Sequence, residues 1–241
     1  MRIRHLEQRV WRVGYQPEPW EWADWRWAGP GGRFTGRWDA LDGGLYRTIY
    51  AGDSLFACLV ELLAPLRPDP TLVGELDQIT VDPEDQAQYP TLSAGTVDVD
   101  NWAENRLASS ARMEGRFCVI TAAATIASLW PRFHAAAVSL YDLQDFDAAA
   151  LKDARPRELT QAVSQHLWNA RSTGGMDLCD GIEFLSRHGD DLVLWALFER
   201  SGDGQTSPRI SDVEHHHLLR DTPELVEACN FLGLRLRHAE P

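Results

Sequence analysis

The stretch from Gly36 to Ala64, GRWDALDGGLYRTIYAGDSLFACLVELLA, predicts a turn, a strand and a helix in direct succession. Residues 36–44 are rich in glycine and aspartate, which tolerate the backbone angles of tight turns. Residues 45–51 alternate in polarity as a strand does, with Tyr50 near its end. Ser54 is a suitable N-cap for the apolar helix that follows. We expect the rest of the fold to pack around this unit.

The predicted helix is apolar on nearly every face and carries one charged residue, Glu61. A buried carboxylate is costly unless it meets a cation, hydrogen-bond donors or a cleft. Its neighbours at helical spacing, Ala57, Cys58, Ala64 and Pro65, are small and leave room for another group to approach. Two interpretations stay open at this point: a structural carboxylate paired with an arginine, and a functional carboxylate in a site.

Length and charge restrict the function classes. A chain of 241 residues can bury a full core, and we expect one domain over residues 1–241. The formal net charge of −13 argues against DNA or RNA as the main partner, although a small phosphorylated ligand needs only a few local arginines. The N-terminus lacks the apolar core of a signal peptide, and no apolar run is long enough to span a bilayer. We therefore expect a cytoplasmic protein without membrane contact.

Neither the cysteines nor the histidines have the spacing of a metal site. His215 and His217 would share one face of a strand, but no second pair of ligands supports them, so we predict a surface run and no metal. The four cysteines are far apart, and each lies in or beside an apolar segment, which indicates reduced core thiols. They are Cys58, Cys118, Cys179 and Cys229.

Periodicity along the chain predicts a succession of short strands and helices. Residues 135–141 fit either a strand or a helix, residues 82–100 read as an irregular acidic stretch, and the segment 209–233 should pack on the core as a final strand and helix. The other predicted strands are 7–14, 72–81, 116–121, 181–186 and 192–198, the last two joined by a five-residue loop, and the other predicted helices are 122–133 and 156–171.

Tryptophan is concentrated in one short segment, where it is interleaved with charges of both signs. Tryptophans among basic residues would suggest base stacking on single-stranded nucleic acid. Here the mixed charges and the acidic chain favour a packed flap or a stacking wall for a planar ligand. The residues are Trp20, Trp22, Trp25 and Trp27, with Glu21, Asp24 and Arg26 between them.

The order of these motifs resembles the RES domain family, which is named after an arginine, a glutamate and a serine. The resemblance covers about residues 8–200 and is carried by GRWD, YRTIYAGDS, the helix with Glu61, TQAVSQHLW, DGIEFLSR and VLWALFER. It maps the three naming residues onto Arg37, Glu61 and Ser186. The family's strand tyrosine corresponds to Tyr50, and the arginine of its opening strand to Arg12. Arg33 competes with Arg37, because Thr35-Gly36 stands where the family has Gly-Gly.

The resemblance implies an α+β fold, with a mixed β-sheet core flanked by helices, similar to that of the ADP-ribosyltransferase toxins. RES proteins are usually toxins of toxin–antitoxin pairs, neutralised by an Xre-type helix-turn-helix partner. Their activity is the destruction of NAD at the nicotinamide bond, by phosphorolysis or hydrolysis. The implied substrate is therefore NAD, with inorganic phosphate as co-substrate and no permanently bound cofactor. Whether the chain forms a homodimer stays open.

The resemblance also implies a role for each matched residue. Cleavage of the nicotinamide bond creates an oxocarbenium-like ribose and expels a neutral leaving group, so a fixed negative charge near the ribose is needed, which Glu61 would supply. Arg37 would hold the pyrophosphate or an incoming phosphate bidentately. The other implied contacts are stacking on nicotinamide by Tyr50 or Trp38, a hydrogen bond from Ser186 to ribose or phosphate, and a second phosphate contact by Arg12.

Two other functions fit the same motifs. The chain could transfer ADP-ribose to a protein acceptor, or it could be a catalytically inert module that binds a nucleotide or a partner. Turnover of NAD separates the enzymes from the binding module, and the identity of the product separates the enzymes from each other.

Overall fold

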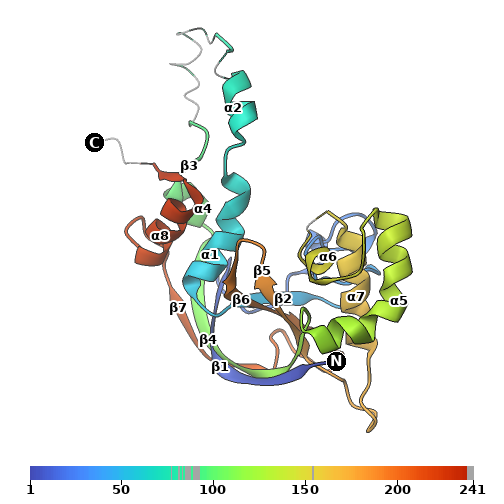
Figure 1. Cartoon of the computed structure of the whole chain (residues 1–241). Helices are drawn as coiled ribbons and strands as arrows, with labels where there is room; N and C mark the ends of the chain where they lie inside the picture. The colour runs from blue at the N-terminus through green and yellow to red at the C-terminus, as the bar shows by residue number, and fades with distance from the viewer. Residues whose placement is uncertain are drawn as a thin grey trace.

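A computed structural model of the chain describes residues 1–76, 78–80, 82, 84, 88, 93–153 and 155–237. A curved mixed sheet is flanked by helices on two sides, which confirms the predicted α+β class (Figure 1). The strands are β1 (Ile3–Tyr15), β2 (Thr48–Gly52), β3 (Thr96–Val97), β4 (Arg106–Val119), β5 (Gly181–Ser186), β6 (Gly189–Phe198), β7 (Ile210–His216) and β8 (Arg235–Leu236). The α-helices are α1 (Leu55–Leu63), α2 (Pro70–Leu76), α4 (Val99–Ala103), α5 (Ala123–Tyr141), α6 (Ala148–Lys152), α7 (Arg157–Asn169) and α8 (Pro223–Leu232). Short 3-10 turns cover Trp25–Trp27, Pro30–Gly32 and Ala64–Leu66.

The large sheet has the strand order β1-β2-β6-β5-β4-β7, and β1 also pairs with β4 along its whole length. The pairings therefore form a closed circuit of five strands, with β7 attached to β4. All pairs in this sheet are antiparallel except β4 with β5. One cluster of buried side chains comes from the strands of this circuit and includes Trp20 and Trp22; the other lies between sheet and helices.

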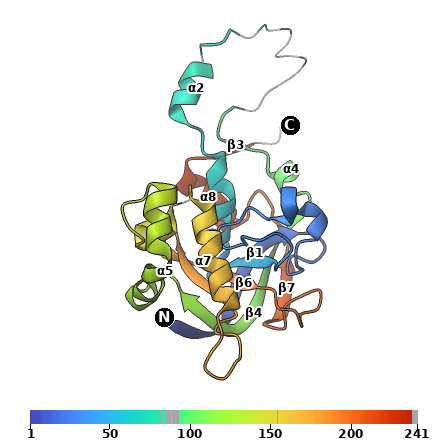
Figure 2. The same ribbon diagram turned by 90° about the vertical axis from the view of Figure 1, so that its right-hand side faces the viewer.

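The helices form two groups. The first pairs α1 with α8, and α1 also packs on β1; the second joins α5 to α7, which packs on β5 (Figures 1 and 2). Helix α1 begins where the sequence predicts, because the Ser54 hydroxyl accepts a hydrogen bond from the Ala57 N–H at 3.1 Å. Within the segment 209–233, β7 pairs with β4 of the sheet and α8 packs on α1.

Several predicted boundaries are wrong. Residues 72–81 were expected to form a strand, but the described part contains helix α2, and residues 77 and 81 lie outside the description. Asp69 explains the helix, since its side chain accepts a hydrogen bond from the Thr71 N–H at 2.8 Å just ahead of the first turn. Of the acidic stretch 82–100, the described part contains β3 and the start of α4.

Two elements are longer than predicted. Helix α5 continues through Pro131 to Tyr141, so residues 135–141 are helical; Leu129, Phe133 and Ala137 are buried on both sides of the proline. Their packing compensates for the hydrogen bond that proline cannot donate. Strand β4 begins ten residues before its predicted start at residue 116, and the β5–β6 turn leaves two residues between the strands instead of five.

The tryptophan-rich segment is a packed flap on the sheet. Trp20 and Trp22 are 1% and 5% exposed, and the Trp20 indole N–H donates to Ser109 Oγ at 2.8 Å. Trp27 is exposed. The start of the flap therefore belongs to the buried cluster formed by the strands of the circuit, whereas its end at Trp27 faces solvent.

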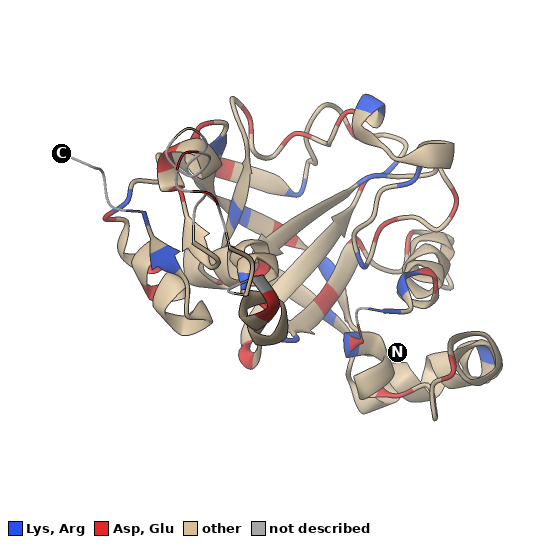
Figure 3. Cartoon of the chain, turned by 90° about the horizontal axis from the view of Figure 1, so that it is seen from above, with Lys and Arg blue, Asp and Glu red and all other residues tan. Residues whose placement is uncertain are grey.

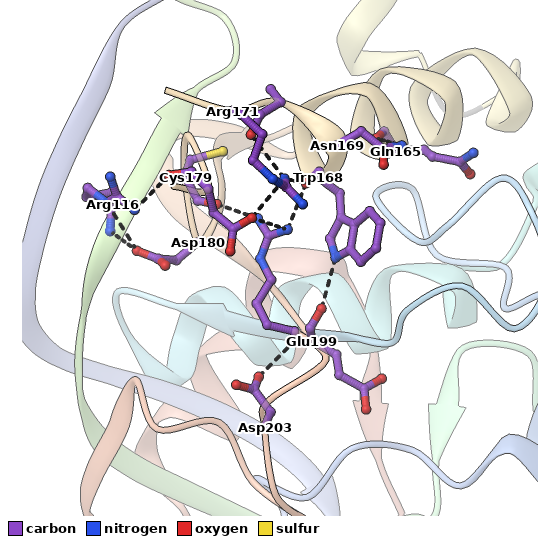
Figure 4. A network of polar contacts seen from close by, with 12 residues as sticks. Arg116, Gln165, Trp168, Asn169, Arg171, Cys179, Asp180, Glu199 and Asp203 are labelled. Atoms are coloured by element: carbon purple, nitrogen blue, oxygen red, sulfur yellow. Dashed lines mark hydrogen bonds and ion pairs between the residues drawn. The ribbon is translucent and has the colours of Figure 1, made fainter. Parts of the chain in front are cut away.

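Polar contacts also join the end of β6 to helix α7. Figure 4 shows the Trp168 indole N–H donating to the Glu199 carbonyl, at 2.9 Å. The Arg200 guanidinium donates to the carbonyls of Trp168 and Cys179, at 2.7 and 2.6 Å. Nearby, Arg116 of β4 forms an ion pair with Asp180, the residue just before β5. The contacts of Trp168 hold the end of α7 against the end of β6.

The remaining predictions concern single residue types. All four cysteines are free and buried, as predicted. The histidines at 215–217 are exposed, with His215 Nδ1 3.0 Å from Ser109 Oγ.

None of the described helices is both long and apolar enough to cross a membrane. Acidic and basic residues are spread over the whole ribbon (Figure 3).

Candidate active site

A cavity of about 460 Å³ lies where α1, β1, β2, the start of α7 and the β5–β6 hairpin meet. Sites for small molecules usually enclose about 300–1,000 Å³, so this cavity has a suitable size. The lining residues are Arg12, Val13, Gly14, Tyr15, Gly36, Arg37, Tyr50, Ala51, Cys58, Glu61, Leu62, Pro65, Arg106, Arg157, Phe184, Arg187 and Leu194. The stretch from Gly36 to Ala64 therefore supplies the turn, strand and helix on one side of the cavity.

Glu61 faces the cavity from α1, together with its small neighbours Cys58 and Pro65. Ser186, at the end of β5, donates a hydrogen bond from Oγ to Glu61 Oε1 at 2.5 Å. The same Oγ accepts the backbone N–H of His188 at 2.9 Å, so the hydroxyl is fixed on both sides. Among the residues that the structure describes, this bond is the only polar contact of the Glu61 carboxylate. The interpretation of Glu61 as half of a structural ion pair is therefore wrong.

Ser186 itself is 1% exposed and does not belong to the cavity wall. Its predicted hydrogen bond to a ribose or phosphate is not available in this arrangement, because the hydroxyl proton is directed at Glu61. The structure instead makes Ser186 a residue that positions the carboxylate. A charge-assisted hydrogen bond of this kind is stronger than a neutral one, so it restricts the rotamer of Glu61.

Arginines dominate the charge of the cavity, although the chain as a whole is acidic. Glu61 is the sole carboxylate among the described lining residues. Such a concentration of one charge sign in a concave site attracts ligands of the opposite sign. The cavity is therefore suited to an anion. The arginines are Arg12, Arg37, Arg106, Arg157 and Arg187.

Arg37 is the most informative of these arginines. It is 9% exposed, and within the described part of the chain no hydrogen-bond acceptor contacts its guanidinium. Burial lowers its pKa, and the negative charge of Glu61 opposes that shift, whereas Arg157 and Arg187 reinforce it. The guanidinium opens into the cavity, where it can bind the oxygens of an anionic ligand bidentately.

Arg12 also lines the cavity, but its nitrogens are engaged with the backbone. Nε donates to the Pro19 carbonyl at 2.6 Å, and Nη1 donates to the Tyr50 carbonyl at 2.9 Å. Burial lowers the pKa of Arg12 to about 10. Arg12 therefore connects the tryptophan-rich flap to β2, and its contact with a phosphate stays a prediction.

Tyr50 and Phe184 form an aromatic part of the wall, with their rings 6.5 Å apart and perpendicular. The Tyr50 hydroxyl donates to Asp39 Oδ1 at 2.9 Å and accepts the Trp38 N–H at 2.8 Å. Burial raises the Tyr50 pKa well above its usual value, so the hydroxyl stays protonated. A Cβ at Gly36 would overlap this hydroxyl, which explains the glycine at the turn.

Two residues considered in the sequence analysis, Trp38 and Arg33, lie outside the cavity wall. Trp38 is fully buried, with its ring 5.7 Å from Phe184, and is not part of the cavity wall, so its predicted stacking on a ligand is wrong. Its side chain fills the core beneath the turn. Arg33 donates to Gln161 at 2.6 Å and also lies outside the wall. Arg37, not Arg33, faces the cavity.

The sequence did not single out Phe184, which forms the aromatic wall with Tyr50, or four further residues of the site. Arg187 directly follows Ser186 in the LSR motif, and Arg157 is the first residue of α7 after Pro156, so both had a local signal. Arg106 had no local signal, because the start of β4 was not predicted. Tyr15 had none either, since it lies just beyond the predicted strand 7–14. The Arg106 guanidinium lies over the Tyr15 ring at 5.1 Å and forms the outer rim with it.

A second hollow, of about 540 Å³, lies beside α8 and β8. None of its described lining residues is a carboxylate, and its Arg237 is already paired with Asp98 at 2.8 Å. It therefore has no counterpart of the fixed carboxylate in the first cavity, although Arg235 also lines it.

Comparison with known proteins assigns no family. No protein-family model matches the chain, and no curated protein does. Among solved structures, the crystal structure of the M. tuberculosis MbcT–MbcA toxin–antitoxin complex is similar, with a TM-score of 0.43 and 15% sequence identity. The match covers 96% of this chain and 90% of that one. A likeness of this degree carries no functional conclusion, so function has to be argued from the site.

Proposed function

We propose that the protein cleaves the nicotinamide N-glycosidic bond of NAD, with inorganic phosphate as the attacking group. One observation carries the proposal: a carboxylate fixed by Ser186 faces a cavity with five arginines in an acidic chain. NAD combines an anionic pyrophosphate, which suits the arginines, with a ribose that becomes cationic in the transition state, which suits Glu61. The motif order of the RES family points to the same substrate.

Arg37 binds the pyrophosphate in this proposal. Its guanidinium lines the cavity and has no acceptor among the described residues, so a bidentate contact to phosphate oxygens would satisfy it. The edge-to-face pair of Tyr50 and Phe184 offers an apolar surface for the nicotinamide ring. Glu61 then lies on the ribose side, held by Ser186 at 2.5 Å.

The reaction needs little proton transfer. The bond between ribose C1′ and the nicotinamide nitrogen breaks, and its electron pair leaves with the neutral nicotinamide. A phosphate oxygen then forms the new bond at C1′ and gives phosphorylated ADP-ribose. With water as the attacking group, the product is ADP-ribose and one proton is released. Glu61 stabilises the positive charge of the ribose through both versions.

The test is to mix the purified protein with NAD and phosphate and to follow nicotinamide and the second product by chromatography. We expect nicotinamide together with phosphorylated ADP-ribose. Nicotinamide with ADP-ribose alone indicates hydrolysis, and label transferred from NAD to protein in a lysate indicates ADP-ribosyl transfer. A folded protein that binds NAD and leaves it intact would refute the proposal in favour of a binding module.

The resemblance also suggests a toxin role with an Xre-type antitoxin that covers the cavity and supplies DNA binding. Expression in bacteria should then arrest growth, and the arrest should depend on Glu61. Co-expression of the cognate antitoxin should restore growth. Harmless expression of an active enzyme would contradict the toxin role and leave the NAD chemistry in place.

A further inference from the structure

Gln161, on α7, contacts the segment just before Arg37 with all of its polar atoms. It is 2% exposed, and its Nε2 donates to the Phe34 carbonyl at 3.1 Å and to the Gly36 carbonyl at 3.0 Å. Its Oε1 accepts from Arg33 Nη2 at 2.6 Å. One buried amide thus joins helix α7 to the turn, although the two lie 125 residues apart in sequence.

Arg33 gives this amide a defined orientation. An arginine has only donors, so it must face the oxygen of the amide, and the NH₂ group is then directed at the two carbonyls. Arg33 is therefore explained as a support for Gln161. An amide turned the other way would place its oxygen against the carbonyls of Phe34 and Gly36 and leave two partly buried acceptors without this donor.

The turn is held from the other side by Asp39 and Tyr50. Asp39 Oδ2 accepts the Gly36 N–H at 2.5 Å, and the Tyr50 hydroxyl accepts the Trp38 N–H at 2.8 Å. The backbone on both sides of Arg37 is thus fixed, whereas its guanidinium contacts no described acceptor. These hydrogen bonds fix the point from which the Arg37 side chain extends into the cavity.

We propose that Gln161 is a positioning residue that holds the Arg37 turn in the geometry required to bind the phosphate groups of the substrate. The inference rests on the proposed function in one respect, the assignment of the pyrophosphate to Arg37. Such a residue acts through Arg37 and touches neither ligand nor reacting atoms. Its loss should weaken ground-state and transition-state binding equally, which raises KM and leaves kcat unchanged.

Gln165 provides a matched control. It lies one turn later on α7, and its side chain contacts the same loop at Asp42, with Nε2 donating to Oδ2 at 2.6 Å and Oε1 accepting the N–H at 2.9 Å. Asp42 does not line the cavity. Gln161→Leu and Gln165→Leu therefore both remove an amide that joins α7 to this loop, the first beside Arg37 and buried, the second farther from Arg37 and more exposed.

The experiment measures KM and kcat for NAD, and the Kd of ADP-ribose by calorimetry. Gln161→Leu should raise KM and Kd about tenfold, as loss of a buried hydrogen-bonded amide allows, with kcat within about twofold. Gln161→Glu should do the same, because it keeps the acceptor for Arg33 and has no donor for the carbonyls. In an Arg37→Ala background, Gln161→Leu should have no further effect on Kd. Equal effects of the two leucine variants, or an undiminished effect without Arg37, would overturn the proposal.

Hydrogen exchange decides the same question without turnover. Gln161→Leu should speed exchange of the Gly36 and Trp38 amides in the free protein, and Gln165→Leu should not. Unchanged exchange at both amides would overturn the proposed clamp. The wild-type protein could leave NAD intact while Gln161→Leu still speeds exchange of these two amides. That result would refute the proposed NAD cleavage and support the role of Gln161 in holding the turn.

Discussion

The hydrogen bond between Ser186 and Glu61 allows a quantitative prediction. Ser186→Ala removes a donor 2.5 Å from the Glu61 carboxylate, at a position that is 1% exposed. Hydrogen bonds to charged groups contribute about 1.5–3 kcal/mol, and the buried site gives water little access to replace this one. Glu61 should then sample other rotamers.

If the whole of that free energy is lost in the transition state, kcat should fall about 10- to 100-fold, since about 1.4 kcal/mol corresponds to a factor of ten. The loss of the bond to the His188 N–H should also lower the free energy of unfolding, by about 1 kcal/mol. Both effects follow from one hydroxyl group, but only the first concerns catalysis.

Ser110→Ala is the matched control. Ser110 is fully buried in β4, and its hydroxyl has no hydrogen-bond partner among the described residues. The control therefore removes a buried hydroxyl without removing a bond, and it should leave both kcat and stability almost unchanged. The assay is steady-state release of nicotinamide, with urea denaturation of each variant alongside. A kcat for Ser186→Ala within twofold of the wild type would refute the positioning of Glu61 by Ser186.

Two further predictions concern charge and thiols. Arg157→Gln should raise the KM for NAD several-fold at low salt, because one cation leaves the cavity, whereas Arg155→Gln should not, because Arg155 is exposed and paired with Asp153; equal KM values for both variants would contradict the role of the cavity charge. Burial raises the pKa of Cys58 to about 12 and that of Cys118 to about 11, so at pH 8 about one such thiol in 1,000 or fewer is a thiolate. The native protein should therefore react with a disulfide reagent far more slowly than the denatured protein, and rapid native labelling would show that these thiols are accessible.

The sequence predicts those parts of the fold in which local signals agree with tertiary packing. Ser54 caps α1, and the apolar run after it is buried, so this helix follows from the sequence alone. The first ten residues of strand β4 do not, because Ser109, Ser110 and Arg112 interrupt the apolar pattern. Ser109 is buried there because Trp20 and the Glu214 backbone satisfy its hydroxyl, and those partners come from distant parts of the chain.

The site shows the same division. Arg37, Glu61 and Tyr50 were predicted and line one cavity, while the functions assigned to them stay predictions. The role of Ser186 could not be read from the sequence, because its burial depends on how the hairpin meets α1. Trp38 failed as a ligand contact for the same reason, since only packing determines which face of the turn is the core.

The central claim is that Glu61 stabilises the cationic ribose in an NAD-cleaving site, and Glu61→Gln tests it most directly. The amide keeps an oxygen that can accept from Ser186, so the fold and the thermal midpoint should be retained. Nicotinamide release from NAD should fall about 10²- to 10³-fold, as for other groups that stabilise charge in a transition state. Release within tenfold of the wild-type rate, from an equally stable protein, would contradict the claim.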